Sequence, residues 1–338
     1  MAFITTEITF KGQGDENFLD AGTVFKPMLQ ANALSSLGFD IRTDIVTYKD
    51  MYKVVPQRKV TRSKSNCGWN PYGQLAELID DRIEVKKLGI EMEQCAEDFD
   101  GLILQTAKKL GVERADLTGT QLQSVLSTMA QEAAFHDMMR IMFLGDEASA
   151  DEDYNQTDGI WKRLFTGVAN SEVTKVGAGL GSDPLPAGAA EGILDGLYYG
   201  ATPEMQDLDD SEKRFYVTRS IYNNWKQTLT KNKNLESSWA ELKNGIKTLT
   251  YLGVPLIPLG FIDQSLRNDF VDAGTGKVIN PHRALYAKPE NLTIGMDQES
   301  DYQTAKFWYQ EKEEMNYMRI KYKLGTALGW GEYIAVSY

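Results

Sequence analysis

The 338-residue sequence has little cysteine and histidine and no long apolar run. Its two cysteines, Cys67 and Cys95, are too few for a disulfide framework or a four-thiolate metal site, which favours a reducing compartment. No stretch approaches the roughly 18 apolar residues of a membrane span. The first residues, MAFITTEITFKG, lack the charged and apolar regions of a signal peptide. We therefore expect no membrane partner.

Positive charge is outnumbered, with 36 basic residues against 48 acidic ones. The formal net charge is −12 and the sequence pI is near 4.8, which argues against general nucleic-acid binding by the whole surface. One segment differs: between Asp50 and Glu77 there is no acidic residue, and the basic residues are Lys53, Arg58, Lys59, Arg62 and Lys64. This segment is either a solvated hairpin tip or a loop that reaches an acidic partner surface, with a nucleic-acid contact as the third alternative.

Motifs for catalysis are missing as well. Glu132 and His136 lie four apart on one face of a predicted helix, a geometry that suits a metal or acid–base pair. The only other histidine is His282 and there is no HExxH pattern, so a surface ion pair or hydrogen bond is the preferred interpretation. The glycine run at 177–181 opens no helix, and the acidic stretch at 146–153 lacks calcium-loop spacing. We predict no catalytic, cofactor or metal site.

The strongest structural signal is a long helix over residues 121–144. Thr120 can cap its start, Gln123 occupies the capping-box position, and Gly145 supplies the stop. At about 1.5 Å per residue it would run roughly 36 Å. Its wide apolar stripe requires other parts of the protein laid along it. The stripe contains Leu122, Val125, Leu126, Met129, Ala130, Ala133, Phe135, Met138, Met139 and Met142.

The remaining pattern mixes strands and helices. Residues 1–40 form an extended arm with a short helix near 27–34, and a Gly/Pro-rich connection at 170–186 is the best candidate domain boundary. Strands are predicted at 41–55, 82–95 (one or two), 215–219, 246–259, 304–309, 317–328 and 332–338. Helices are predicted at 97–110, 186–199 and 221–231, the last capped by Ser220, and a polar loop with residues 268–285 follows the strand at 246–259.

Several segments, in this order, resemble one family. They are VKKLGIEMEQCAEDFDGLILQTAKKLG, FLGDEA, DGIWKRLF, FYVTRSIYNNWKQTL, YLGVPLIPL, NPHRALYAKPENLTIG and FWYQEKEEMNYMRIKYKLGTALGWGEYIAVSY. Their order and spacing from about residue 80 onward are similar to the major capsid proteins of tailed double-stranded-DNA bacteriophages, the Hong Kong 97-type fold. In that family a strand starts near the position of DGIWKRLF.

The resemblance implies an α+β fold with five parts. These are an N-terminal arm at 1–40, an E-loop at 41–80, a P-domain at 81–185 with a spine helix at 120–144, an A-domain at 186–300, and closing strands at 301–338. In the family, the arm and E-loop lie over neighbouring subunits. This agrees with an arm that has no core of its own and a basic segment on an acidic protein.

The resemblance also implies a function. Copies would assemble into pentamers and hexamers of an icosahedral shell around phage DNA, in a virion assembled in the host bacterial cytoplasm. Expected partners are further copies, scaffolding, portal and decoration proteins, and DNA through non-specific contact only. Inter-subunit contacts are assigned to Lys53, Arg58, Lys59, Arg62, Lys64 and Trp69. Two alternatives stay open: an encapsulin-like compartment, and a metal-dependent hydrolase that uses Glu132, His136 and the 146–153 stretch.

Overall fold

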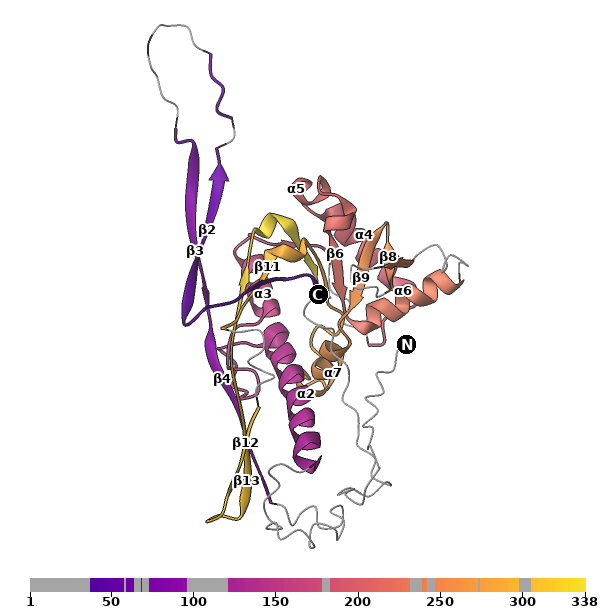
Figure 1. Cartoon of the computed structure of the whole chain (residues 1–338). Helices are drawn as coiled ribbons and strands as arrows, with labels where there is room; N and C mark the ends of the chain where they lie inside the picture. The colour runs from indigo at the N-terminus through magenta and orange to yellow at the C-terminus, as the bar shows by residue number, and fades with distance from the viewer. Residues whose placement is uncertain are drawn as a thin grey trace. The chain divides into compact units, whose positions relative to one another are not determined.

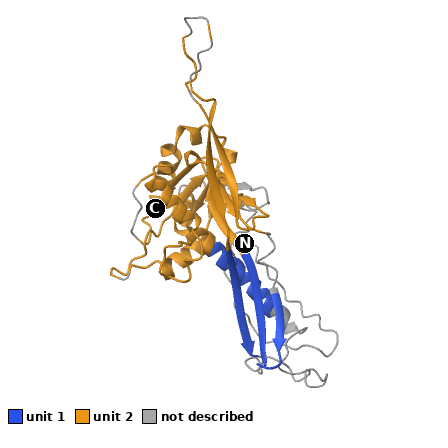
Figure 2. Ribbon diagram, turned by 90° about the vertical axis from the view of Figure 1, so that its left-hand side faces the viewer, with its two compact units in different colours: residues 1–31, 87–140, 298–322 blue, residues 32–86, 141–297, 323–338 orange. Residues whose placement is uncertain are grey.

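The computed structural model (Figure 1) describes residues 37–57, 59–63, 68, 73–95, 121–177, 183–231, 239–241, 247–272, 274–297 and 305–338. The chain divides into two compact units (Figure 2). The described residues within 87–140 and 298–322 belong to the first unit, and those within 32–86, 141–297 and 323–338 belong to the second. The predicted boundary at 170–186 lies inside the second unit.

Some predictions fall outside the described residues. They are the arm through residue 36, the helix at 97–110, the cap Thr120, most of the glycine run at 177–181, and the site residues Arg58, Lys64 and Trp69. These stay predictions.

The long predicted helix is confirmed. Helix α2 spans Gln121–Leu144, and no proline or glycine interrupts its 24 residues. Met138, Met142 and Phe143 are fully buried. Gly145 follows the helix directly. The position requires glycine, because an added Cβ would lie 2.2 Å from the carbonyl oxygen of Thr157. Neither α2 nor another helix in the described ranges is long and apolar enough to cross a bilayer.

The first unit contains an antiparallel sheet. β12 (Ala305–Gln310) pairs with β13 (Met315–Leu328), and β4 (Lys86–Cys95) also pairs with β13. Side chains alternate along β13, so that Met318 and Ile320 are buried while Arg319 and Lys321 lie on the other face. This period of two is the strand pattern that the sequence predicted for the closing segments.

The second unit is built on a seven-stranded sheet with the order β5-β14-β10-β6-β9-β8-β7. Its central strands are buried, so they form short continuous apolar runs. The strands are β5 (Thr174–Lys175), β6 (Arg214–Val217), β7 (Trp239–Glu241), β8 (Lys247–Tyr251), β9 (Val254–Pro258), β10 (Ala284–Ala287) and β14 (Ile334–Ser337).

Helices supply the rest of this core. Leu194 and Leu197 of α4 (Ala189–Gly200) and Trp225 of α6 (Arg219–Lys231) pack against Phe215 and Tyr286, whose rings stack with centroids 4.3 Å apart. The short elements are α5 (Pro203–Gln206), η3 (Asp210–Glu212), η5 (Pro289–Asn291) and η7 (Gly331–Tyr333). β1 (Asp40–Arg42) runs parallel to β11 (Leu292–Gly295), and β11 pairs antiparallel with the end of β13, so these strands share the sheet that contains β13.

Two strand predictions need correction. The segment DGIWKRLF forms helix α3 (Ile160–Ala169), because Ile160, Trp161 and Leu164 bury one helical face. The segment at 41–55 is not one strand: it breaks between β1 and β2 (Tyr48–Pro56). Asp44 adopts a left-handed φ of 61°, and the chain turns there so that the side chain of Ile45 is buried.

Helix α7 (Gly260–Asp269) was not predicted; it lies between the predicted strand at 246–259 and the predicted polar loop and overlaps the loop only at its last two residues. Its Asp263 accepts hydrogen bonds from the backbone N–H groups of Arg219 and Ser220, at the start of α6. The prediction that Ser220 caps α6 is therefore wrong, because a carboxylate from another helix takes that role. Ser220 Oγ instead lies 2.7 Å from Nδ1 of the buried His282.

The Asp263 contact gives stability a pH dependence. Burial raises the pKa of this carboxyl to about 6, although the N–H groups of Arg219 and Ser220 and the charges of Arg219 and Arg267 lower it. A raised folded-state pKa means that the folded state binds the proton more tightly. The resulting stabilisation is complete below the unfolded pKa of 3.8 and is lost as pH rises through 6.

We expect the free energy of unfolding of wild-type subunits, relative to Asp263→Asn, to fall by about 1 kcal/mol between pH 5 and pH 7.5. Urea unfolding at several pH values measures this difference. The asparagine oxygen keeps one acceptor for the Arg219 N–H group while removing the titration. Parallel pH curves for the two proteins would contradict the prediction.

Candidate assembly surface

Strands β2 and β3 (Ala76–Glu84) form a hairpin at the predicted E-loop. Figure 1 shows it, in indigo, projecting from the other strands and helices of its unit. Within the described residues this sheet has only these two strands. A two-stranded hairpin is marginally stable in water by itself. Its role therefore depends on what anchors its root and what covers its faces.

The root is anchored by a small apolar core and one ammonium group. Met51 and Ile83 are buried in a cluster completed by Ile45, Val85 and Ala327. Lys53 Nζ lies 2.6 Å from a carboxylate oxygen of Asp81 and donates a 3.2 Å hydrogen bond to the carbonyl oxygen of Leu328. The contact with Leu328 ties β2 to the end of β13 in the same unit.

The face of the hairpin that points away from this core is exposed and carries apolar side chains beside charged ones, which are Asp50, Asp80, Arg82 and Glu84. Residues directly opposite in an antiparallel pair share a face. Tyr52 pairs with Asp80, and Val54 with Leu78, so these side chains share a face with Tyr48. Tyr48, Tyr52, Val54 and Leu78 are each more than half exposed. Tyr52, Val54 and Leu78 are neighbours on this face, whereas the Asp50–Arg82 ion pair separates Tyr48 from them. An exposed apolar group of this kind indicates an interaction site.

The predicted contact residues are not equivalent. Lys53 is half-buried and forms the ion pair with Asp81, so its charge is largely used within the subunit. Lys59 and Arg62 are exposed beyond the end of β2, and Lys59 has a left-handed φ of 65°. The predicted contact residues were mostly basic, so they did not include the exposed apolar side chains of this hairpin. The alternation of Tyr48, Tyr52 and Val54 with charged residues contained that signal.

The anchoring role of Lys53 can be measured. We expect Lys53→Met to lower the free energy of unfolding by about 1 kcal/mol, because it removes a partly buried ion pair and a hydrogen bond to a backbone carbonyl. Lys49→Met is the matched control: Lys49 is exposed on the same strand and forms no ion pair with a residue that the structure describes. Chemical denaturation compares the two. Equal losses would show that Lys53 does not anchor the root.

Glu132 and His136 lie on α2, and Glu132, but not His136, lines a groove of about 440 Å³ in the first unit. Burial lowers the pKa of His136. The negative charges of Glu132 and Asp137 raise it, but by less than burial lowers it. The groove wall is mostly apolar, with Met129, Phe307 and Met318. No group of three or more potential metal ligands occurs in the part of the chain that the structure describes. The hydrolase hypothesis gains no support from this groove.

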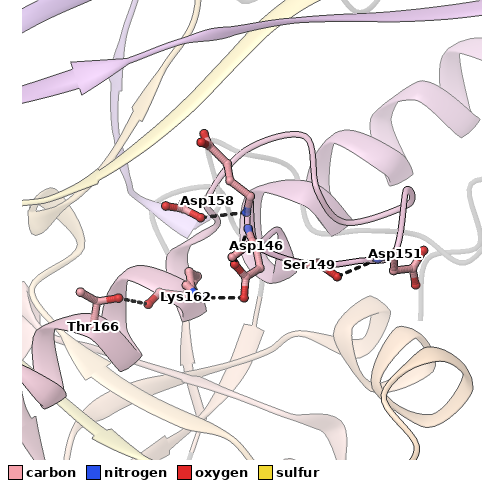
Figure 3. A network of polar contacts seen from close by, with 8 residues as sticks. Asp146, Ser149, Asp151, Asp158, Lys162 and Thr166 are labelled. Carbon is pink, nitrogen blue, oxygen red and sulfur yellow. Dashed lines mark hydrogen bonds and ion pairs between the residues drawn. The ribbon is translucent and has the colours of Figure 1, made fainter.

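The acidic stretch after α2 uses several of its carboxylates internally (Figure 3). Asp146 lies 2.8 Å from Lys162 Nζ and accepts a hydrogen bond from the Ala148 N–H group. Asp158 accepts from the Glu147 N–H group. The hydrogen bond with Asp146 raises the pKa of Lys162. These contacts support the interpretation as a solvated, self-bonded loop.

The fold of this chain is similar to that of capsid proteins of known structure. No protein-family model and no curated protein matches its sequence. Its mixed helix-and-sheet structure, however, matches phage capsid structures. The capsid of Myoviridae phage XM1 is similar over 93% of this chain and 94% of that chain, with a TM-score of 0.59 and 12% identity.

Two further structures extend this class. The capsid of the native GTA particle is similar over 93% of this chain and 98% of that chain, with a TM-score of 0.54 and 11% identity. The holo-SrpI encapsulin complex from Synechococcus elongatus PCC 7942 is similar over 94% of this chain and 91% of that chain, with a TM-score of 0.52 and 10% identity. At such identities the similarity establishes the fold.

Proposed function

We propose that this chain is the major capsid protein of a tailed double-stranded-DNA phage, with the Hong Kong 97-type fold. Its copies assemble into pentamers and hexamers that close into an icosahedral shell around the genome. The single observation that carries the proposal is the β2–β3 hairpin, one face of which exposes apolar side chains within a fold similar to that of phage capsids. In the assembled shell, a second copy of the chain covers this face.

The proposed mechanism is assembly, and it needs no catalytic residue or cofactor. The hairpin and the N-terminal arm of one copy lie over neighbouring copies, and the A-domains meet around the symmetry axes. Such contacts join different patches on each copy, so they close into rings. The basic residues at the hairpin end, including Lys59 and Arg62, bias encounter and register more than net affinity.

The same proposal places the protein in the virion, after assembly in the host cytoplasm. Scaffolding, portal and decoration proteins are the expected partners besides further copies. The net charge of −12 suits loose, non-specific coexistence with packaged DNA, since a strongly basic inner surface would hold phosphates tightly.

The second candidate is an encapsulin-like compartment, which the similarity to the SrpI encapsulin favours. The two functions differ in what the shell encloses. Particles purified from the native source that contain protein cargo and no nuclease-protected DNA would favour the compartment. Protected double-stranded DNA would favour the phage capsid.

A charge variant tests the assembly role of the hairpin end. Neutralising Arg58, Lys59, Arg62 and Lys64 together should lower particle yield at physiological salt at least about tenfold, because these charges steer encounter. The melting temperature of the free subunit should stay within about 2 °C, as for surface changes. Electron microscopy and size-exclusion chromatography measure the yield.

The matched control changes charge elsewhere by the same amount. It neutralises four exposed lysines outside residues 41–80: Lys226, Lys231, Lys277 and Lys312. We expect this control to assemble like the wild type. Normal particle yield from the hairpin variant would refute its role, and a wild-type protein that forms no particles would refute the capsid function itself.

A further inference from the structure

Arg283, in the second unit, is a buried cation without a counter-ion. It directly precedes β10 and is only 4% exposed. Burial lowers the pKa of its guanidinium to about 10, and no neighbouring carboxylate acts against this shift. Among the residues that the structure describes, its side chain makes one hydrogen bond, from Nε to the carbonyl oxygen of Asn280 at 3.2 Å. Both Nη groups therefore lack an acceptor in the described chain, although a buried arginine is normally paired.

Three aromatic rings lie close to this guanidinium. Its central carbon is 5.4 Å from the centre of the Trp161 ring, 5.5 Å from that of Phe165 and 5.8 Å from that of Phe270. Trp161 and Phe165 lie one turn apart on α3, and Phe270 follows the last residue of α7. Aromatic faces attract a cation, which explains how the fold tolerates Arg283 here. They are weak hydrogen-bond acceptors, so the Nη groups remain available to a stronger one.

The same cluster contains a second donor without a partner. Trp161 is 2% exposed, and its Nε1–H group has no acceptor in the part of the chain that the structure describes. Buried indole N–H groups usually find a hydrogen-bond partner. Two neighbouring side chains, each more than nine-tenths buried, thus bring donors and one positive charge to a cluster that holds no acceptor for them. An anion would supply the acceptors and balance the charge.

The surroundings favour a carboxylate that carries an apolar group. A guanidinium matches the two oxygens of a planar carboxylate with two parallel N–H donors. Phe165 and Phe270 are only half-buried, so their rings also offer apolar surface to a molecule that enters from outside. A phosphate has four oxygens, and apolar rings would leave some of them without a partner. A second cation is near: Lys175 Nζ lies 3.7 Å from the centre of the Tyr338 ring, which packs at 4.6 Å on Phe165.

We propose that Arg283 and Trp161 form a binding site for a carboxylate with an apolar body. The Nη groups of Arg283 hold the two oxygens, the Trp161 N–H group donates to one of them, and the rings of Phe165 and Phe270 contact the apolar part. Two sources supply this chemistry: a free organic acid, and the side chain of an aspartate or glutamate in another copy. The inference goes beyond the proposed function, because the free subunit binds the carboxylate whether or not a shell forms.

Calorimetric titration of the free subunit with benzoate tests the inference. We expect saturable binding of one benzoate per chain, and acetate should bind at least about threefold more weakly because it lacks the ring. Arg283→Met should weaken benzoate binding at least about tenfold, since it removes the charged pair of donors. Trp161→Phe should weaken it about fivefold, because it removes one N–H group and keeps an aromatic ring.

Melting curves separate a binding site from an arginine that only supports the fold. Without benzoate, Arg283→Met should melt no lower than the wild type, because methionine removes an unpaired buried charge and keeps apolar volume. Benzoate should raise the melting temperature of the wild type and leave that of Arg283→Met unchanged. Arg214→Met is the matched control: Arg214 begins β6 of the same sheet, and its Nη1 donates to the carbonyl oxygens of Ser211 and Lys213. It should bind benzoate like the wild type.

Assembled particles distinguish the two sources of the carboxylate. Particles that exclude benzoate, when free subunits bind it, indicate a side chain of another copy, and particles that bind it equally well indicate a free acid. Inorganic phosphate that binds as tightly as benzoate would overturn the carboxylate assignment. The inference is also wrong if wild-type subunits bind no benzoate up to about 20 mM, or if wild type and both site variants bind it equally. Either result leaves the proposed function intact, whereas a wild type that forms no particles defeats only that function.

Discussion

Gly325→Ala should lower the free energy of unfolding of the subunit by about 3 kcal/mol or more. A Cβ at position 325 would lie 1.9 Å from the carbonyl oxygen of Glu84, 2.9 Å from its carbonyl carbon and 3.2 Å from the Cα of Val85. All three are backbone atoms, so no side-chain rotation relieves the overlap. The strand β13 and the junction between β3 and β4 would have to separate, and the apolar cluster around Val85 would open.

The substitution also bears on assembly, because Glu84 ends β3 at the root of the hairpin. A shift there moves the whole projecting element, so particle yield should fall together with stability. Gly192→Ala is the control. It lies within α4 with nothing within 4 Å of the added Cβ, and we expect it to stabilise by about 0.5–1 kcal/mol. A Gly325→Ala protein with wild-type melting temperature and yield would contradict this account.

Phe143→Ala should cost about 3–5 kcal/mol, the range for removing a buried phenylalanine side chain. Phe143 is fully buried in the last turn of α2. Its ring centroid lies 5.9 Å from that of Phe39 and 5.4 Å from that of Phe261 on α7. Phe39 in turn lies 5.1 Å from Tyr216 on β6. The substitution leaves a cavity where helix, sheet and the entry to β1 meet.

Urea unfolding of the free subunit measures this loss. Phe143→Leu should cost less than half as much, because leucine retains most of the apolar volume. Tyr199→Ala, on the exposed side of α4, should stay within about 0.5 kcal/mol of the wild type. If Phe143→Ala and Tyr199→Ala cost the same, the aromatic cluster does not hold the end of α2.

Much of the secondary structure could be predicted from local pattern. The 24-residue run without proline or glycine over α2 and the period of 2 over β13 are long enough to indicate a helix and a strand, and both elements occur where expected. Helix α7 was missed because its segment, GFIDQSLRND, is short and largely polar. Its helical state depends on Phe261, Ile262 and Leu266 finding the core, and on Asp263 meeting the N-terminus of α6.

The candidate site could also be predicted only in part from the sequence. Composition alone identified a basic segment at residues 50–77, and the spacing of Tyr48, Tyr52 and Val54 showed a strand. Sequence could not show that Lys53 is used internally by Asp81 and the Leu328 carbonyl, 275 positions away in the chain. Burial and long-range partners determine which charges remain for another molecule, and neither is a local property.

By itself, the sequence determined an acidic chain with a long apolar helix, a strand-rich C-terminal part and a segregated positive segment, because these follow from composition and from periods of a few residues. Only the tertiary structure decided which faces stay uncovered. The exposed apolar side chains of the β2–β3 hairpin come together through strand register, since pairing places Val54 beside Leu78. Register depends on contacts between residues far apart in the chain, and the surfaces available for assembly depend on register.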